Sequence, residues 1–261
     1  MPLTRKEFDL LTTLLYNPGK TGSQRAVASL SGLSLGTVNQ HLMAAVQKGW
    51  VASTSGGYTV TEEGMKALDA IVSAGITEIV IVRGYLGEQF DMLLKKYPGI
   101  RFVENPDYLE MNNISSAMKV RDLFGGAYVL DSDLYLQNPK LIRPYEYCAS
   151  YLGVHMDKTD DWRLVVKNGR VTGMKVGGTD CYHMYDITYW TPADGEKMAR
   201  LLPELFNAPG GKQCYWDDVP LTHYNDQFYI EPRPCKEGDI LEIDTLSELV
   251  ALDPAYRIPK K

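Results

Sequence analysis

The 261-residue chain has few cysteines and no long apolar run, and both shortages narrow its class. Its four cysteines show no Cys-x-x-Cys spacing, which argues against a zinc knuckle or a thioredoxin-like redox pair. No stretch approaches the roughly 18 consecutive apolar residues that a membrane span needs, and the first residues lack the apolar core of a signal peptide. We therefore expect a cytoplasmic globular protein with reduced thiols and no membrane span.

Positive charge is also scarce, because 27 Lys and Arg stand against 33 Asp and Glu, for a net charge of −6. The deficit is uneven along the chain. Residues 1–62 carry five basic and three acidic side chains, a balance of +2, which leaves −8 for residues 63–261. A mildly basic head on an acidic body predicts two modules with different roles. We place these modules at residues 1–67 and 68–261.

The first module has the pattern of three helices followed by a hairpin. Apolar residues at helical spacing predict helices that begin after Thr4, Ser23 and Ser34, each of which can cap the helix it precedes. A Ser-Gly-Gly turn at residues 55–57 joins two short strands. This order, and the segments LSLGTVNQHLMAAVQKGWV and GYTVTEEGMKAL, resemble the winged helix-turn-helix domains of bacterial regulators.

This resemblance implies that the third helix faces the major groove of DNA. The residues that would meet the groove are Ser34, Thr37, Asn39, Gln40 and His41. The same helix carries almost no Lys or Arg, although phosphate neutralisation normally supplies most of the affinity for DNA. DNA binding and a dimerisation or regulatory role both stay open, because a fold does not fix a function.

The second module alternates strands and helices in its first half. Strand-like runs at residues 76–82, 100–104 and 127–130 are separated by helical segments, which is the pattern of βαβ units. Beyond residue 133 several strand segments follow without helices, and an amphipathic helix is expected at 196–206. We predict an α/β fold with a Rossmann-like mixed sheet, in which a parallel part covered by helices is extended by antiparallel strands.

Two carboxylates follow the third of these strands, at Asp131 and Asp133. Functional groups collect at the carboxyl ends of strands in α/β proteins, and carboxylate oxygens are the ligands that Mg²⁺ prefers. Aspartates at such a position also commonly end a strand and begin a turn. The residues alone therefore leave a metal site and a simple turn as alternatives.

Six ordered segments of the second module resemble the nucleotidyltransferases that make CDP-choline and related activated alcohols, close cousins of the sugar-nucleotide pyrophosphorylases. The segments are ITEIVIVRGYLGEQF, NPDYLEMNNISSAM, YVLDSDLYL, DDWRLVV, CYWDD and LEIDTLSEL. The resemblance spans about residue 70 to the end. It implies a Rossmann-like fold in which a nucleoside triphosphate, expected to be CTP, meets a phosphorylated small alcohol and releases pyrophosphate, with Mg²⁺ as cofactor.

The resemblance also gives roles to single residues. Asp133 and Asp244 match the catalytic metal ligands, with Asp131 beside them as a further ligand. Asn112 and Asn113 match an Asn pair near the nucleotide, although Asn112 reads equally well as the N-cap of a helix.

A choline-like ammonium has no N–H donor, so its site needs aromatic faces and a carboxylate. The residues that match such a site are Asp161, Trp162, Tyr215, Trp216 and Asp217. The histidines at 155, 183 and 223 show no ligand spacing and are expected to be structural.

One element of this family is missing from the sequence. Its members begin with a strand and a glycine-rich loop, Leu-x-x-Gly-x-Gly-x-Arg, followed by a Pro-Lys pair, which together wrap the triphosphate. Here residues 65–68 run directly into 69–75, and no Gly-x-Gly-x-Arg occurs in the chain. We expect nucleotidyl transfer to be weak or lost, which keeps a ligand-sensing or DNA-binding regulator as the alternative. A sheet without its first strand also has open edges, which the head or a second copy of the chain would cover.

Overall fold

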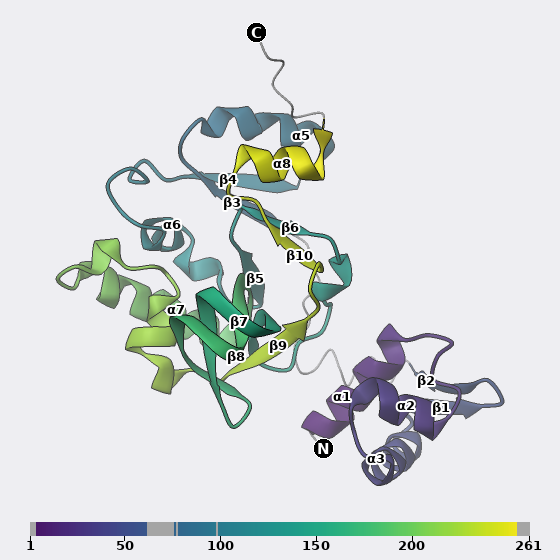
Figure 1. Cartoon of the computed structure of the whole chain (residues 1–261). Helices are drawn as coiled ribbons and strands as arrows, with labels where there is room; N and C mark the ends of the chain where they lie inside the picture. The colour runs from purple at the N-terminus through teal and green to yellow at the C-terminus, as the bar shows by residue number, and fades with distance from the viewer. Residues whose placement is uncertain (1–3, 62–75, 77, 98, 255–261) are drawn as a thin grey trace. The chain divides into compact units, whose positions relative to one another are not determined.

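The computed structural model describes residues 4–61, 76, 78–97 and 99–254 (Figure 1). The chain forms two compact units. Unit 1 comprises Met1–Gly75 and Pro144–Tyr147, and unit 2 comprises Ile76–Arg143 and Cys148–Lys261. The predicted module boundary at 67/68 and the helix expected across 65–74 lie outside the described residues.

Unit 1 contains three helices and one hairpin. They are α1 (Arg5–Tyr16), α2 (Gln24–Ser31), α3 (Leu35–Gln47), β1 (Val51–Thr54) and β2 (Gly57–Val60). The side chains of Thr4, Ser23 and Ser34 each accept a hydrogen bond from a backbone N–H in the first turn of the helix that follows. The helices and the antiparallel hairpin predicted from the sequence are confirmed. They were predictable because caps and apolar spacing act within a single element.

The core of unit 1 includes a short segment that is distant in sequence, Pro144–Tyr147. Tyr145 is 8% exposed and packs in the same cluster as Phe8 and the buried leucines of α1. The ring of Tyr147 lies 5.3 Å from that of Phe8, and the Arg5 guanidinium lies 5.0 Å from the Tyr147 ring. The chain therefore contributes to unit 1 a second time, just before the longest strands of unit 2.

Unit 2 contains the remaining strands and helices. In chain order they are β3 (Ile79–Arg83), η1 (Gly87–Met92), α5 (Leu93–Lys96), β4 (Ile100–Glu104), α6 (Ile114–Lys119), β5 (Ala127–Leu130), β6 (Leu134–Leu136), β7 (Ala149–Lys167), β8 (Arg170–Trp190), α7 (Pro192–Asn207), β9 (Ile230–Cys235), β10 (Ile240–Glu242) and α8 (Leu246–Leu252). Four of the strands form a mixed sheet in the order β5-β8-β7-β9, with only the β7–β9 pair parallel. The predicted α/β class with an antiparallel extension is confirmed.

Strands β7 and β8 form one long hairpin where the sequence pattern predicted several shorter strand segments. Its two-residue turn uses Asn168 and Gly169, both at positive φ (51° and 74°), as a type I′ turn requires. The pairing shifts register between Thr159 and Trp162. Residues 157–161, of which all but Thr159 are charged, interrupt the apolar alternation at this irregularity, so the apolar pattern ends although the strand continues.

The parallel part of the sheet is interrupted. Strands β3 and β4 pair with each other in a sheet of their own, and no ladder between described residues joins them to β5. In a doubly wound sheet of order 3-2-1-4, the first strand lies between the second and the fourth. The break therefore falls where the strand missing from this sequence would lie. Each of the two flanking strands carries an exposed apolar residue, Ile79 at 48% and Leu130 at 44%.

The main core of unit 2 lies between the mixed sheet and α7. Tyr151 and Trp190 on the sheet are fully buried against Met198 and Leu202 of the helix. This dense packing holds β5, β7 and β8 together, and residues of the candidate site lie on these strands or directly after them. Among the described helices, none combines the length and the apolar character needed to cross a membrane.

Candidate active site

Three carboxylates converge where β6 pairs with β10. The antiparallel register sets Glu242 opposite Leu134, and the Ile243 N–H donates to the Asp133 carbonyl at 2.9 Å. This pairing brings side-chain oxygens of Asp133, Glu242 and Asp244 within 4.8 Å of one another. A donor set made only of carboxylate oxygens fits a hard cation such as Mg²⁺. We call these three residues the carboxylate triad.

The backbone around the triad is fixed by a helix start. The Glu248 carboxylate accepts the backbone N–H groups of Asp244 and Thr245 at 3.0 and 2.9 Å, in the capping box that opens α8. A recess lined in part by Asp133 and Leu249 opens beside the triad. The triad thus lies beside an accessible recess. Its backbone is held by the pairing of β6 with β10 and by the capping box of α8.

Glu242 was not predicted from the sequence. Burial, together with the charges of the nearby carboxylates, Asp244 first among them, raises its pKa to about 7. The sequence did contain a signal for Glu242. It lies two residues before Asp244, and residues two apart in an extended segment point to the same face. A cation at this place would relieve the repulsion among the three acids.

Asp131 has a different environment from Asp133. Burial and the charge of Asp133 raise the pKa of Asp131, a hydrogen bond from the Trp216 side chain lowers it, and the pKa that results is about 6. Its backbone N–H donates to the Asp186 carbonyl at 3.2 Å. Asp131 is therefore held between β8 and the loop after α7, and it is not part of the triad.

The Asn pair braces the loop that carries Trp216. Asn113 Oδ1 accepts the Trp216 backbone N–H at 2.9 Å, and Asn112 Nδ2 donates to the Gln213 carbonyl at 3.2 Å. Helix α6 begins after Asn113, whose side chain makes no capping bond, and the Asn112 side chain accepts the Asn113 backbone N–H at 2.7 Å, so Asn112 also contributes to the start of the helix. Both asparagines position the loop of residues 212–217.

The aromatic residues of the predicted ammonium site divide into two groups. Trp216 is 4% exposed, with its ring 5.5 Å from that of Phe124 and 6.0 Å from that of Trp190. Trp162 and Tyr215 instead form an edge-to-face pair at 6.2 Å, and Tyr215 is 44% exposed. The accessible ring surface therefore belongs to Trp162 and Tyr215, while Trp216 packs in the core and supports Asp131.

Two further acids are buried next to this loop. The Tyr151 hydroxyl donates to Asp217 Oδ2 at 3.1 Å, and Asp217 is 5% exposed. Burial raises the pKa of Asp217 to about 7 and that of Asp186 well above its usual range, where the Asp217 charge adds to the effect. Within the described part of the chain, the buried Asp186 Oδ1 has no hydrogen-bond partner. Buried acids of this kind mark a place where a cation is expected to bind.

Asp186 was also missed by sequence reasoning. In the sequence of β8, Asp186 has the same phase of the strand alternation as the buried Met184, Thr188 and Trp190. An acid in the inward phase of an apolar strand is the signal that identifies it.

Comparison with known proteins decides the family. The chain is 32% identical over 193 residues to the 2-aminoethylphosphonate cytidylyltransferase of Lancefieldella rimae, an alignment that covers 72% of this chain and 78% of that protein. It is also 32% identical over 188 residues to the choline-phosphate cytidylyltransferase of Haemophilus influenzae, covering 70% and 79%. The chain belongs to this cytidylyltransferase family.

Solved structures agree with the assignment to the cytidylyltransferases. The CTP:phosphocholine cytidylyltransferase of Streptococcus pneumoniae matches with a TM-score of 0.62 and 26% identity, over 75% of this chain and 84% of that one. The inositol-1-phosphate CTP transferase of T. maritima shares the fold alone, with a TM-score of 0.51 and 12% identity over 70% and 75%. No family model matches the chain.

The residues predicted to meet DNA lie outside this cytidylyltransferase unit, on α3 of unit 1. Ser34 Oγ accepts the Thr37 N–H at 3.2 Å, and Asn39 Oδ1 accepts from Gln24 Nε2 at 3.1 Å. Asn39 and Gln40 are exposed, and His41 is half-buried. Four of the five residues therefore lie on α3 and Ser34 caps it, and Asn39 and Gln40 present exposed amides at successive positions.

Proposed function

We propose that this chain transfers the cytidylyl group of CTP to a small phosphonate or phosphate that carries an amine, at a low rate. The observation that carries the proposal is the carboxylate triad beside two buried acids, Asp186 and Asp217, in a chain of this family. An acceptor oxygen attacks the α-phosphorus while pyrophosphate leaves, so anions must be brought together. Bound at Asp133, Glu242 and Asp244, Mg²⁺ would neutralise part of that charge.

The amine end of the acceptor would be recognised by the second group of residues. A bound ammonium would favour the charged forms of Asp217 and Asp186, whose pKa values are raised in its absence, and the edge-to-face pair of Trp162 and Tyr215 supplies ring surface for a cation. Asn112 and Asn113 would keep the loop that carries Asp217 at its place near the nucleotide. The rate is expected to be low because the sequence holds no Gly-x-Gly-x-Arg loop for the triphosphate.

Substitution of Asp244 tests this proposal. Asp244→Asn is expected to lower pyrophosphate release from CTP and 2-aminoethylphosphonate by about 10²-fold to 10³-fold, because one charged ligand of the cation is lost. Removal of Mg²⁺ by a chelator should have the same effect. Asp226→Asn, which changes an exposed acid elsewhere in unit 2, should leave the rate unchanged. If the original chain releases no pyrophosphate above background, transfer is lost and the proposal is wrong.

We infer a second role, DNA binding, for unit 1, whose helix order and hairpin fit a winged helix-turn-helix. The favouring observation is the exposed polar face at the start of α3, with Asn39 and Gln40. A gel-shift assay with genomic fragments should give complexes that weaken steeply with salt. Asn39→Ala together with Gln40→Ala should abolish sequence preference and leave the fold intact. Equal retention of all fragments by the variant and the original chain would exclude groove reading by α3.

A further inference from the structure

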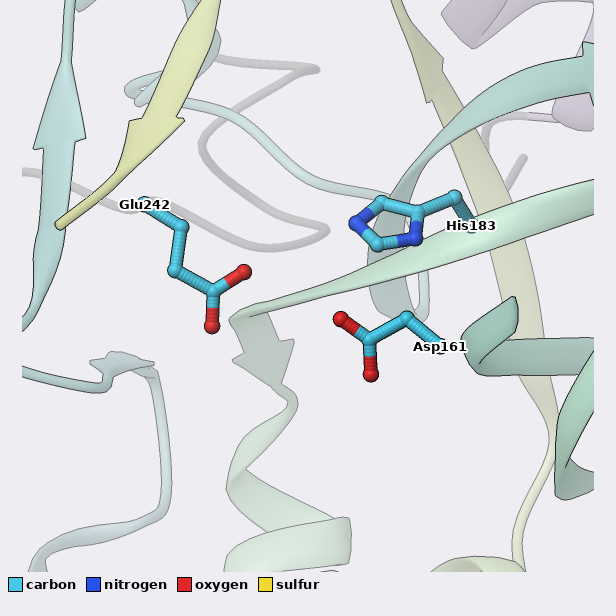
Figure 2. A group of neighbouring side chains, drawn as sticks. All are labelled: Asp161, His183 and Glu242. Atoms are coloured by element: carbon cyan, nitrogen blue, oxygen red, sulfur yellow. The ribbon is translucent and has the colours of Figure 1, made fainter. Parts of the chain in front are cut away.

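We propose that Asp161, His183 and Glu242 form a second metal site, for a divalent transition-metal ion such as Zn²⁺, beside the carboxylate triad (Figure 2). The three side chains come from β7, β8 and β10, and one ligand atom of each lies within 4.8 Å of the others. Figure 2 shows the imidazole and both carboxylates directed toward a common space. This site does not depend on the proposed transfer reaction.

The histidine is oriented by its surroundings. Thr159 Oγ1 lies 3.2 Å from His183 Nδ1, which leaves Nε2 as the ligand atom. The Tyr185 ring packs edge-to-face on the imidazole at 4.8 Å. Metal-binding histidines are typically held in this way, by a hydrogen bond at the ring nitrogen that does not bind the ion.

The acid on β7 is held by the same local structure. Thr159 Oγ1 also accepts the Asp161 N–H at 3.2 Å, and Asp161 Oδ1 accepts the Trp162 N–H at 2.7 Å. Both bonds fall within the register shift of β7, which turns Asp161 toward His183. Thr159, which is 8% exposed, thus contacts both His183 and Asp161. Acidic side chains that merely lie on a surface are not held by a shared buried group of this kind.

The ligand types separate this site from the triad. Mg²⁺ prefers oxygen ligands only, whereas an imidazole nitrogen with carboxylates suits Zn²⁺ and similar ions. Glu242 belongs to both groups, because it is also within 4.8 Å of Asp133 and Asp244. Two sites of different chemistry therefore share one carboxylate, and a transition metal bound at one site would change the charge available to the other.

Calorimetric titration of the full chain with Zn²⁺, in the presence of excess Mg²⁺, tests the site. We expect one Zn²⁺ bound per chain, and an affinity at least about tenfold lower in His183→Ala. His223→Ala, which removes an exposed histidine from another part of unit 2, is the matched control and should bind as the original chain does. Thr159→Val keeps the ligands and removes their common support, so it should weaken binding by a smaller factor.

Two results would overturn the proposal. The first is an absence of Zn²⁺ binding under these conditions. The second is Zn²⁺ binding that His183→Ala and Thr159→Val leave unchanged, which would assign the ion to thiols or to other groups. Circular dichroism of both variants checks that the hairpin of β7 and β8 is retained. Glu242→Gln should weaken Zn²⁺ binding and, in a separate titration, Mg²⁺ binding as well.

Discussion

Insertion of a strand and glycine-rich loop between Leu68 and Asp69 is expected to raise kcat/KM for CTP by about a thousandfold or more. The reason is that backbone N–H groups and basic side chains of such a loop hold the triphosphate and the charge that develops on it. The break between β3 and β5 provides the place for the inserted strand. The measurement is pyrophosphate release as a function of CTP concentration, with and without the insertion.

The control for this experiment is an insertion with the same strand, in which the loop glycines and its arginine are replaced by alanine. It should restore the sheet, and so raise thermal stability, with little gain in turnover. An original chain that already turns over as fast as the chain with the full insertion would contradict the expectation. In that case other residues would hold the triphosphate.

Asp186→Asn is expected to stabilise the protein at pH 8 when metal and substrate are absent. Burial and the charge of Asp217 raise the pKa of Asp186 well above its usual value near 4. The folded state therefore binds more protons than the unfolded state from about pH 4 up to the raised pKa, and the free energy of unfolding falls as pH rises through this range. An amide removes this loss, by about 1–3 kcal/mol at pH 8.

Thermal unfolding at pH 5 and pH 8 provides the measurement. A chain of this size gains about 2–4 °C in Tm for each kcal/mol, and the gain of Asp186→Asn should be much larger at pH 8 than at pH 5. Asp226→Asn, an exposed acid, should give the same small change at both pH values. The stabilised variant should also bind the amine substrate more weakly. The Asp186 carboxylate destabilises the free protein, and we expect it to be retained because it binds the amine. A lower Tm at pH 8 would contradict this account.

The sequence was sufficient to predict those helices and strands whose formation depends on residues within the element itself. Caps at Thr4, Ser23 and Ser34 located the helices of unit 1, and the apolar run at residues 127–130 located the strand before Asp131. It was insufficient for β7 and β8, because pairing across the hairpin continues the strands through the largely charged segment 157–161. The periodicity of side chains within one strand carries no information about the backbone hydrogen bonds that the strand makes with another.

The same limit applies to the site. Asp133 and Asp244 were found by their resemblance to a family, and the structure places them within reach of each other. Glu242 and Asp186 left signals in their strand phase, yet their proximity to other acids depends on the pairing of β10 with β6 and of β8 with β5. His183 had no neighbour in sequence that marked it, because its partners come from two other strands.

The segment Pro144–Tyr147 has a consequence for how this protein can be divided. Any truncated form that starts at Ile76 keeps Tyr145 and Tyr147 but loses Phe8 and the leucines of α1 that pack with them. A form that ends at Gly75 loses those tyrosines from its own core. Neither fragment therefore keeps the complete core of unit 1. The role of unit 1 is better tested by point substitutions on α3 than by deletion.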